Sequence, residues 1–334
     1  MPSDLIRKVK STVNKYRMLD KHSSVLAGLS GGPDSVALLY SLVSLKNEYR
    51  LNIYIAHMDH MFRGEESRQD RKFCECLAHS LGLPIFCEER DIPAISKKKG
   101  ISPEEAARFE RYDFFFRVMR KMRADKIAVG HTSDDQAETV LMRIMRGSGV
   151  SGLRGISPVK EINGAVIIRP LIEITRREIE CFLKERAIEC RHDSSNDKVI
   201  FTRNRVRHEL IPYLEDKFNP NIKEVLVNMA ENLREEDDFL DRFSGRKFKI
   251  MSGKNSSGEI FIDMRKFKKQ PAAVKKRILR KALKELKGDL RRFTYQHWRE
   301  VEDLISARPV TSIVDLPGGI DIRKEKDRLV LKKA

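Results

Sequence analysis

The sequence lacks the marks of a membrane or secreted protein. No run of 18 apolar residues occurs in its 334 positions, which predicts no membrane-spanning helix. The first residues, Met1–Arg7, lack the apolar stretch of a secretory signal peptide. Cysteines number only five, an odd count without Cys-x-x-Cys spacing, which argues against a disulfide framework. We therefore expect a cytoplasmic protein whose thiols are reduced.

Two common kinds of site also lack their signatures. Neither Gly-Lys-Ser nor Gly-Lys-Thr occurs, so the sequence contains no Walker A loop. The closest cysteines, Cys74 and Cys76, leave a metal or redox pair open, but isolated cysteines usually pack as small apolar side chains. Ordinary thiols are therefore the preferred interpretation.

Acidic residues become scarce toward the C-terminus, and the net charge of +17 is unevenly spread. Residues 1–240 carry 40 Lys+Arg against 37 Asp+Glu, whereas residues 241–334 carry 26 against 12. A near-neutral body followed by a basic region is typical of a catalytic domain joined to one that grips a polyanion such as RNA. A solubilising lysine-rich surface is the alternative.

Short apolar segments alternate with amphipathic ones from residue 23 to residue 146. Alternation of this kind predicts a parallel sheet with helices on both faces, which is a doubly wound, Rossmann-like α/β fold. Its ligands should bind at the carboxyl ends of the strands. The expected strands are 23–29, 51–56, 84–87 and 126–130, and the expected helices are 36–45, 66–81, 103–122 and 134–146.

The remaining sequence predicts a change of architecture. A strand at 165–168 is followed by helices at 175–186, 202–217 and 220–243. Further elements are strands at 259–262, 314–316 and 329–331, and helices at 271–287 and 294–306. We expect a catalytic domain over 1–217, a helical linker over 218–246 and a small basic α/β domain over 247–334 that binds RNA.

The loop Ser30–Ser35 carries the clearest chemistry. Two glycines allow the backbone to approach a ligand closely, and the following helix directs its amides and its positive dipole end at an anion. A carboxylate in such a loop can hold Mg²⁺ between phosphates. A simple strand-to-helix turn is the alternative. The expected ATP-binding residues are Ser30, Gly31, Gly32, Pro33, Asp34 and Ser35, with Asp34 as the Mg²⁺ ligand.

This loop resembles the pyrophosphate loop, Ser-Gly-Gly-x-Asp-Ser, of the N-type ATP pyrophosphatase superfamily, whose fold is of the adenine nucleotide α-hydrolase type. Four further segments narrow the resemblance to the tRNA(Ile)-lysidine synthetase family. They are His57–Arg63, Gly130–Thr139 running into Arg146–Gly149, Arg169–Glu173, and Asp193–Asn196 with Phe201–Leu210. The late stretch Val314–Gly319 resembles the end of that family's appended domain, which suggests the short architecture without a last C-terminal domain.

The resemblance implies a specific reaction. ATP adenylates the C2 oxygen of the wobble cytidine in an isoleucine tRNA with a CAU anticodon, and the ε-amine of free L-lysine then displaces AMP. The cofactors would be ATP and Mg²⁺, and the chain would act alone or as a homodimer. One departure is that His131 is followed by Thr132, where the family commonly has a second histidine.

Acidic residues open the helix that follows the fourth expected strand. Asp134, Asp135 and Glu138 lie at helical spacing, so they can form a pocket for the ammonium groups of lysine. The attacking amine must lose a proton, which Asp135, Glu138 or His131 could accept. Favourable interaction with the helix dipole is the simpler explanation of these acids.

Other candidates lie on neighbouring segments. Arg108 and Arg111, at i and i+3 of the long expected helix, could stabilise the transferring phosphoryl group as catalytic residues. Surface ion pairs with Glu104 and Glu105 would explain them equally well. His57, three residues before His60, is expected in an adenosine-binding loop, while a metal site there would need further ligands.

Basic residues supply the expected RNA contacts. Near the active site we expect Arg203, Asn204 and Arg207 to contact ATP or the anticodon loop, whose bases are already unstacked. In the small domain, basic residues alternate with aromatic ones, a composition that suits backbone contact and stacking. Those residues are Lys275, Lys276, Arg277, Arg291 and Arg292, beside Phe293, Tyr295 and Trp298, which could instead form a core.

Three other functions compete with this interpretation. A tRNA thiolase of the same superfamily would share the loop and the charge but would need a suitable cysteine pair. A ligase acting on a small molecule would leave the basic C-terminal region unexplained. A nucleotide-binding regulator would bind ATP without releasing pyrophosphate.

Overall fold

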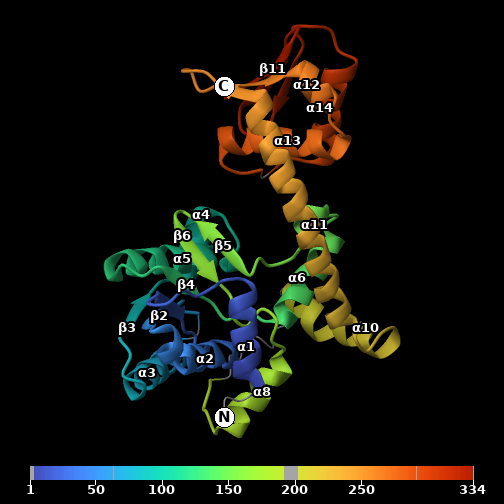
Figure 1. The fold of residues 1–334 in the computed structure, drawn as a ribbon. Coiled ribbons are helices and arrows are strands. Elements are labelled where there is room, and N and C mark those ends of the chain that lie inside the picture. The colour runs from blue at the N-terminus through green and yellow to red at the C-terminus, as the bar shows by residue number, and fades with distance from the viewer. Residues whose placement is uncertain (1–3, 63, 192–201, 291, 334) are drawn as a thin grey trace. The chain divides into compact units, whose positions relative to one another are not determined.

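The computed structural model describes residues 4–62, 64–191, 202–290 and 292–333, and it divides into two compact units (Figure 1). Unit 1 is Met1–Glu231 and unit 2 is Asn232–Ala334. Within the described ranges, no helix has both the length and the apolar character needed to cross a membrane.

A mostly parallel sheet forms the centre of unit 1. Its strand order is β3-β2-β1-β4-β6-β5, and only the pair between the edge strand β5 and β6 is antiparallel. Asn163 and Gly164, both at positive φ, form the two-residue turn between β5 and β6. The doubly wound α/β prediction is therefore confirmed. The strands are β1 (Ser24–Gly28), β2 (Asn52–Asp59), β3 (Ile85–Glu89), β4 (Lys126–Ala128), β5 (Val159–Ile162) and β6 (Ala165–Ile168).

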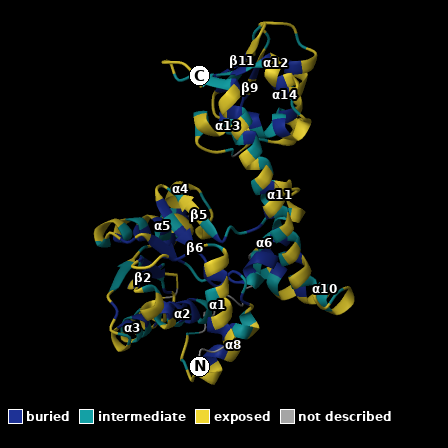
Figure 2. Cartoon of the chain, in the orientation of Figure 1, coloured by how far each residue is buried: buried dark blue, intermediate teal, exposed yellow. Residues whose placement is uncertain are grey.

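Helices cover both faces of this sheet because its strand residues are apolar on both sides. Val25 and Ala27 of β1 pack into one core, while Leu26 between them packs into the other. The first core contains α1 (Asp4–Lys15), α2 (Pro33–Tyr49), α3 (Glu65–Ser80) and α8 (Arg176–Glu185). The second contains α5 (Pro103–Met122), which also contacts α4 (Ile92–Lys99). Figure 2 shows the buried strands between these helices.

A separate helical cluster completes unit 1. Apolar side chains of α6 (Ser133–Met145) pack against Val206, Ile211 and Leu226. The helix expected over 202–217 is divided, since Pro212 has no amide hydrogen to continue the α-helical bonding. The elements are α7 (Val150–Leu153), α9 (Thr202–Arg205), a π-helical turn (Val206–Leu210), α10 (Ile211–Lys217) and the start of α11 (Ile222–Met251).

Unit 2 is a small α/β body around an antiparallel sheet of order β7-β8-β11-β10-β9. Trp298 is buried in its core and Phe293 packs against that core, whereas Tyr295 is 70% exposed. The core interpretation thus holds for Trp298 and not for Tyr295. The strands are β7 (Ser252–Lys254), β8 (Ile260–Asp263), β9 (Ile313–Leu316), β10 (Ile320–Lys324) and β11 (Arg328–Lys333), and the helices are α12 (Met264–Lys268), α13 (Ala272–Lys287) and α14 (Tyr295–Ser306).

Candidate active site

The loops that follow β1 and β4 lie side by side. These strands are neighbours at the point where the strand order reverses, which is where open α/β sheets bind their ligands. A Cβ atom at Gly130 would lie 3.0 Å from the carbonyl oxygen of Asp34 and 3.3 Å from the amide nitrogen of Ser35. Glycine at this position therefore lets the two loops approach closely without a shift of the main chain.

The loop Ser30–Ser35 has the geometry of an anion site. Gly31 has φ 89°, a left-handed conformation that other residues rarely adopt. The amide of Ser30 donates to Oγ of Ser35 at 3.1 Å, and that hydroxyl donates to the carbonyl of Gly32 at 2.9 Å. No side chain caps helix α2 at Gly32, and Pro33 occupies its first turn. The first amides of α2 are thus available to a phosphate.

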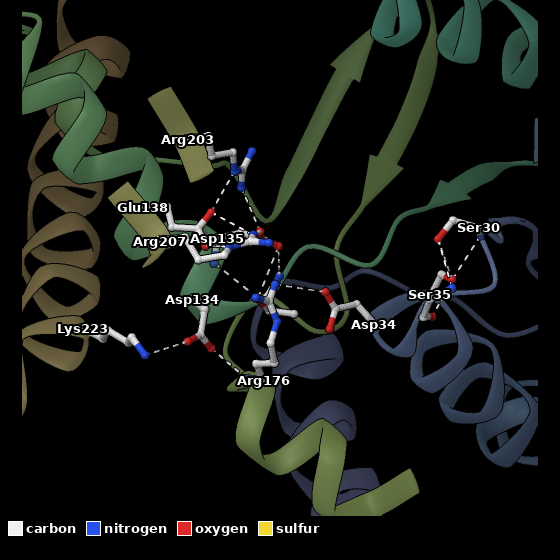
Figure 3. A network of polar contacts seen from close by, with 12 residues as sticks. Ser30, Asp34, Ser35, Asp134, Asp135, Glu138, Arg176, Arg203, Arg207 and Lys223 are labelled. Carbon is white, nitrogen blue, oxygen red and sulfur yellow. Dashed lines mark hydrogen bonds and ion pairs between the residues drawn. The ribbon is translucent and has the colours of Figure 1, made fainter. Parts of the chain in front are cut away.

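Asp34 lies in the first turn of α2, and its side chain points toward Arg176 (Figure 3). Its Oδ2 accepts a hydrogen bond from Nη2 of Arg176 at 3.4 Å, while its buried Oδ1 has no partner in the described chain. Burial raises the pKa of Asp34 to about 6, against the attraction of Arg176. An unsatisfied carboxylate oxygen beside a phosphate loop suits a hard cation such as Mg²⁺.

His57 lies at the end of β2 and is 3% exposed. Its Nδ1 is 3.0 Å from the carbonyl oxygen of Leu29, which can only accept, so Nδ1 carries the proton. Nε2 is buried without a partner in the described chain. Burial lowers the pKa of His57, so the ring stays neutral and offers one acceptor.

Two carboxylates of α6 and two arginines form a compact network (Figure 3). Arg203 donates to Oδ1 of Asp135 and to Oε2 of Glu138, each at 2.8 Å. Arg207 donates to Oε1 of Glu138 at 2.6 Å and to Oδ1 of Asp135 at 3.4 Å. Glu138 is only 1% exposed, so this pairing is needed to keep its charge in the interior. The structure thus joins the predicted lysine-binding carboxylates with the predicted RNA-binding arginines.

Asp135 also caps its own helix. Its Oδ2 accepts the amide of Thr132 at 2.9 Å, and the Thr132 hydroxyl accepts the amide of Asp135 at 3.3 Å. Burial would raise the pKa of Asp135, but Arg203 and His131 outweigh it and hold that pKa below its usual range. Asp135 therefore forms the capping box of α6 in addition to its ion pairs. Thr132 itself is fully buried and serves as the helix cap.

Asp134 points to a different set of partners. Its Oδ2 accepts the amide of Arg176 at 2.7 Å, and its Oδ1 lies 3.3 Å from Nζ of Lys223. Asp134 and Glu138 both line a cavity of about 340 Å³. Sequence reasoning missed Arg176 and Lys223, because nothing local connects them to α6. The other lining residues are Thr175, Arg176, Arg177, Glu180, Arg207, Ile211 and Lys223.

His131 lies among positive side chains. Burial lowers its pKa to about 3, opposed by Asp135 and aided by Arg169 and Arg111. Its Nδ1 is buried without a partner in the described chain. A neutral imidazole at this place can donate or accept a hydrogen bond but carries no charge near neutral pH.

The two predicted arginines of α5, Arg108 and Arg111, differ in their burial. Burial lowers the pKa of Arg111, with Tyr112 acting against it and Arg108 adding to it. Arg108 is exposed, and its guanidinium lies 5.0 Å from the ring centre of Tyr112. Across the described ranges, neither arginine forms an ion pair with Glu104 or Glu105. Arg111 is thus a half-buried cation that has no carboxylate partner among the described residues, which favours an anionic ligand.

The remaining predicted RNA contacts lie on separate elements. Asn204 is half-buried on α9, while Lys275 and Lys276 lie half-buried on α13. Lys276 pairs with Glu302 at 3.4 Å. Arg277 pairs with the buried Asp237, so its charge is balanced inside unit 2. Arg292 is exposed, and Arg291 lies outside the described residues.

Comparisons with known proteins give a consistent picture. Residues 1–214 match the family model described as PP-loop domain, and residues 263–330 match the TilS substrate binding domain. A tRNA(Ile)-lysidine synthase from Caldanaerobacter subterraneus subsp. tengcongensis is 41% identical over 329 residues, which cover 98% of this chain and 69% of that protein. The same enzyme from Clostridioides difficile is 36% identical over 324 residues, with coverage of 97% and 70%.

A solved structure supports the fold. The U34-tRNA thiolase NcsA from Methanococcus maripaludis, solved with its 4Fe-4S cluster, aligns with a TM-score of 0.55 at 22% identity. The alignment covers 70% of this chain and 78% of that one. At this identity the likeness concerns the arrangement of strands and helices alone.

Proposed function

Because the chain belongs to the tRNA(Ile)-lysidine synthase family, we propose that it attaches L-lysine to C2 of the wobble cytidine in an isoleucine tRNA with a CAU anticodon. It is an ATP-using ligase. One observation carries the proposal. The phosphate loop, whose helix α2 has no side-chain cap, and the buried carboxylates Asp135 and Glu138 both follow the carboxyl ends of central strands of the sheet.

The phosphate loop would hold ATP. The first amides of α2 and the hydroxyls of Ser30 and Ser35 would bind the β- and γ-phosphates that leave as pyrophosphate. His57 would accept a hydrogen bond from the nucleoside through Nε2. Asp34 would hold Mg²⁺ through its unpartnered oxygen, and that ion would neutralise charge on the phosphates.

The first chemical step transfers AMP to the cytidine. The C2 oxygen attacks the α-phosphorus, the bond to the β-phosphate oxygen breaks, and pyrophosphate leaves. Arg111 would stabilise the negative charge on the transferring group, with Arg108 beside it. His131, which is neutral near pH 7, would orient the transferring phosphoryl group through a hydrogen bond rather than through charge.

The second step joins lysine. The ε-amine attacks C2, the bond between C2 and the AMP oxygen breaks, and the amine loses a proton. Glu138 or Asp135 would take that proton once lysine replaces an arginine as their partner. Asp134 would attract an ammonium group in the neighbouring cavity, which Glu138 also lines. A cavity of about 340 Å³ is large enough for an amino acid of this size.

The arginines would then serve the RNA. Arg203 and Arg207 pair with Asp135 and Glu138 in this structure. If lysine takes their place, the two guanidinium groups would be able to bind phosphates of an anticodon loop. Asn204, on the same helical segment, would contact the cytidine base. Bases in such a loop are already unstacked, so presenting one to the active site costs little.

The proposal is tested with purified protein, ATP, Mg²⁺ and labelled L-lysine. AMP, pyrophosphate and labelled tRNA are measured with an isoleucine tRNA carrying CAU and with the same tRNA carrying GAU. Lysine entering only the CAU tRNA is the expected result. Pyrophosphate release without lysine incorporation would contradict the proposed nucleophile, and sulfur donors and ammonia would then be tried, as the thiolase alternative requires.

A further inference from the structure

A basic groove runs between α11 and α13 inside unit 2. One hollow of about 480 Å³ is lined by Arg242, Arg246 and Lys249 from α11 and by Lys281 from α13. A second hollow of about 680 Å³ adds Lys254 and Lys284, together with one carboxylate, Glu285. The two hollows share Gly245, Lys249 and Lys281, so they form one continuous feature, called here the α11–α13 groove.

The α11 side of the groove presents an unneutralised stripe of cations. Arg242, Arg246 and Lys249 follow i, i+4, i+7 spacing, which places them on one face of the helix. All three are exposed, and none forms an ion pair anywhere in the described chain. They span roughly 10 Å of helix axis.

Contacts between α11 and α13 hold this stripe in place. Lys281 donates to Asp241 at 2.9 Å, and Arg277 pairs with the buried Asp237 one turn earlier. A Cβ atom at Gly245 would lie 3.5 Å from Nζ of Lys281, so the lysine rests against the bare helix backbone. Gly245 lines both hollows.

An exposed aromatic residue stands at one end of the groove. Phe239 lines the first hollow, is 58% exposed, and stacks on Phe243 with ring centres 6.4 Å apart. Cations beside an exposed ring are the combination that nucleic-acid surfaces use for phosphates and bases.

We propose that the α11–α13 groove holds the sugar–phosphate backbone of the substrate tRNA. This inference rests on the proposed function, since it takes tRNA as the partner, and it names a surface distinct from Lys275–Arg277. Those residues are half-buried, and two of them are engaged by Glu302 and Asp237. Arg242, Arg246 and Lys249, in contrast, form no ion pair within the described residues and can displace counterions from RNA.

The test compares two triple variants of equal charge. The groove variant is Arg242→Gln, Arg246→Gln, Lys249→Gln. The control variant is Lys268→Gln, Lys269→Gln, Lys326→Gln, which removes the same charge from exposed positions outside the groove. Binding of the tRNA is measured for both and for the unmodified protein from 50 to 200 mM salt, together with thermal unfolding.

The groove variant should bind tRNA about 10- to 100-fold more weakly, and its log Kd against log salt should lose a slope of about 2 to 3. The control should change affinity less than about threefold, with little change of slope. Thermal unfolding of both triple variants should match that of the unmodified protein, since all six substituted side chains are exposed.

Equal losses in both triple variants, or unchanged affinity in the groove variant, would overturn the groove as the RNA surface. Lysine incorporation by the unmodified protein separates this failure from that of the proposed function. If the protein modifies tRNA but the groove variant binds normally, only the groove is rejected. If the protein binds tRNA through the groove without incorporating lysine, the groove stands and the reaction is rejected.

Discussion

Unit 1 and unit 2 handle charge in opposite ways. In unit 1, Glu138 and Asp135 are buried and are paired with arginines at hydrogen-bonding distance. In unit 2, the groove residues Arg242, Arg246 and Lys249 are exposed. The sequence beyond residue 240 has 26 Lys+Arg against 12 Asp+Glu. The first arrangement fixes charges where water is scarce, and the second leaves them available to a partner.

The difference follows from what each task requires. Stabilising a transferring phosphoryl group needs charges that are held in position before the reaction, in a site that excludes water. Gripping a polyanion needs only exposed cations, because the release of counterions supplies the affinity. Substitutions in unit 1 should therefore act on rates and folding, and substitutions in unit 2 on salt-dependent affinity.

The largest effect is expected at Asp34. Asp34→Asn removes the charge proposed to hold Mg²⁺, which is worth several kcal/mol, so pyrophosphate release should fall by about 1,000-fold or more. Initial rates of AMP and pyrophosphate formation measure this. The matched control, Asp216→Asn, changes an exposed carboxylate that pairs, among the residues the structure describes, with its neighbour Lys217, and it should keep nearly full activity. A loss below tenfold at Asp34 would contradict the role.

Unit 2 also contains a buried ion pair, between Arg277 and Asp237, and Arg277→Ala tests its contribution to stability. Asp237 would lose the guanidinium that its Oδ1 contacts, so the free energy of unfolding should fall by about 1.5–3 kcal/mol. Denaturant unfolding measures the change. The double variant Arg277→Ala, Asp237→Ala should recover much of the loss, whereas equal destabilisation of both variants would refute a charge-pair origin.

Glu138→Gln tests whether the buried carboxylate of unit 1 takes part in lysine binding. The amide keeps the shape but loses the charge that Arg203 and Arg207 contact, and charged hydrogen bonds contribute about 1.5–3 kcal/mol. The KM for lysine should rise by about 10- to 100-fold, and kcat should fall. Steady-state kinetics with lysine as the varied substrate test this. Unchanged KM and kcat would remove Glu138 from the lysine site.

The smallest effect concerns stability and pH. The pKa of Asp34 is raised to about 6 in the folded chain, above its value of 3.8 when unfolded, so ionised Asp34 destabilises the fold above pH 6. Asp34→Asn should therefore raise the unfolding free energy at pH 7.5 by about 1–2 kcal/mol. The advantage should shrink as pH falls from 6 to 4. A pH-independent difference would contradict the raised pKa.

Much of the fold could be predicted because local signals agreed with tertiary packing. The helix expected over 103–122 has those bounds, since Ser102 caps its start and Arg123 ends it in a left-handed conformation. Strand β5 was missed because only its two ends, Val159 and Ile162, are apolar. Its signal was the Asn-Gly turn that follows.

The candidate site was predictable where its residues form local sequence patterns. The loop Ser30–Ser35 and the acids of α6 are local patterns, so the sequence displays them directly. Arg176 and Lys223 join the site through contacts between segments 42 or more residues apart, which no periodicity reveals. Arg277 likewise pairs with Asp237 across 40 residues, so its charge looked available in the sequence.

The contact between Gly130 and the backbone of Asp34 has a consequence for how this family can diversify. Any side chain at position 130 would press on main-chain atoms at 3.0–3.3 Å, and main-chain atoms cannot rotate away. A saturation library at this position should favour glycine, because any other residue requires the main chain of Asp34 and Ser35 to shift by a few tenths of an ångström. A larger residue at position 130 would therefore act on the nucleotide pocket through the shape of both loops.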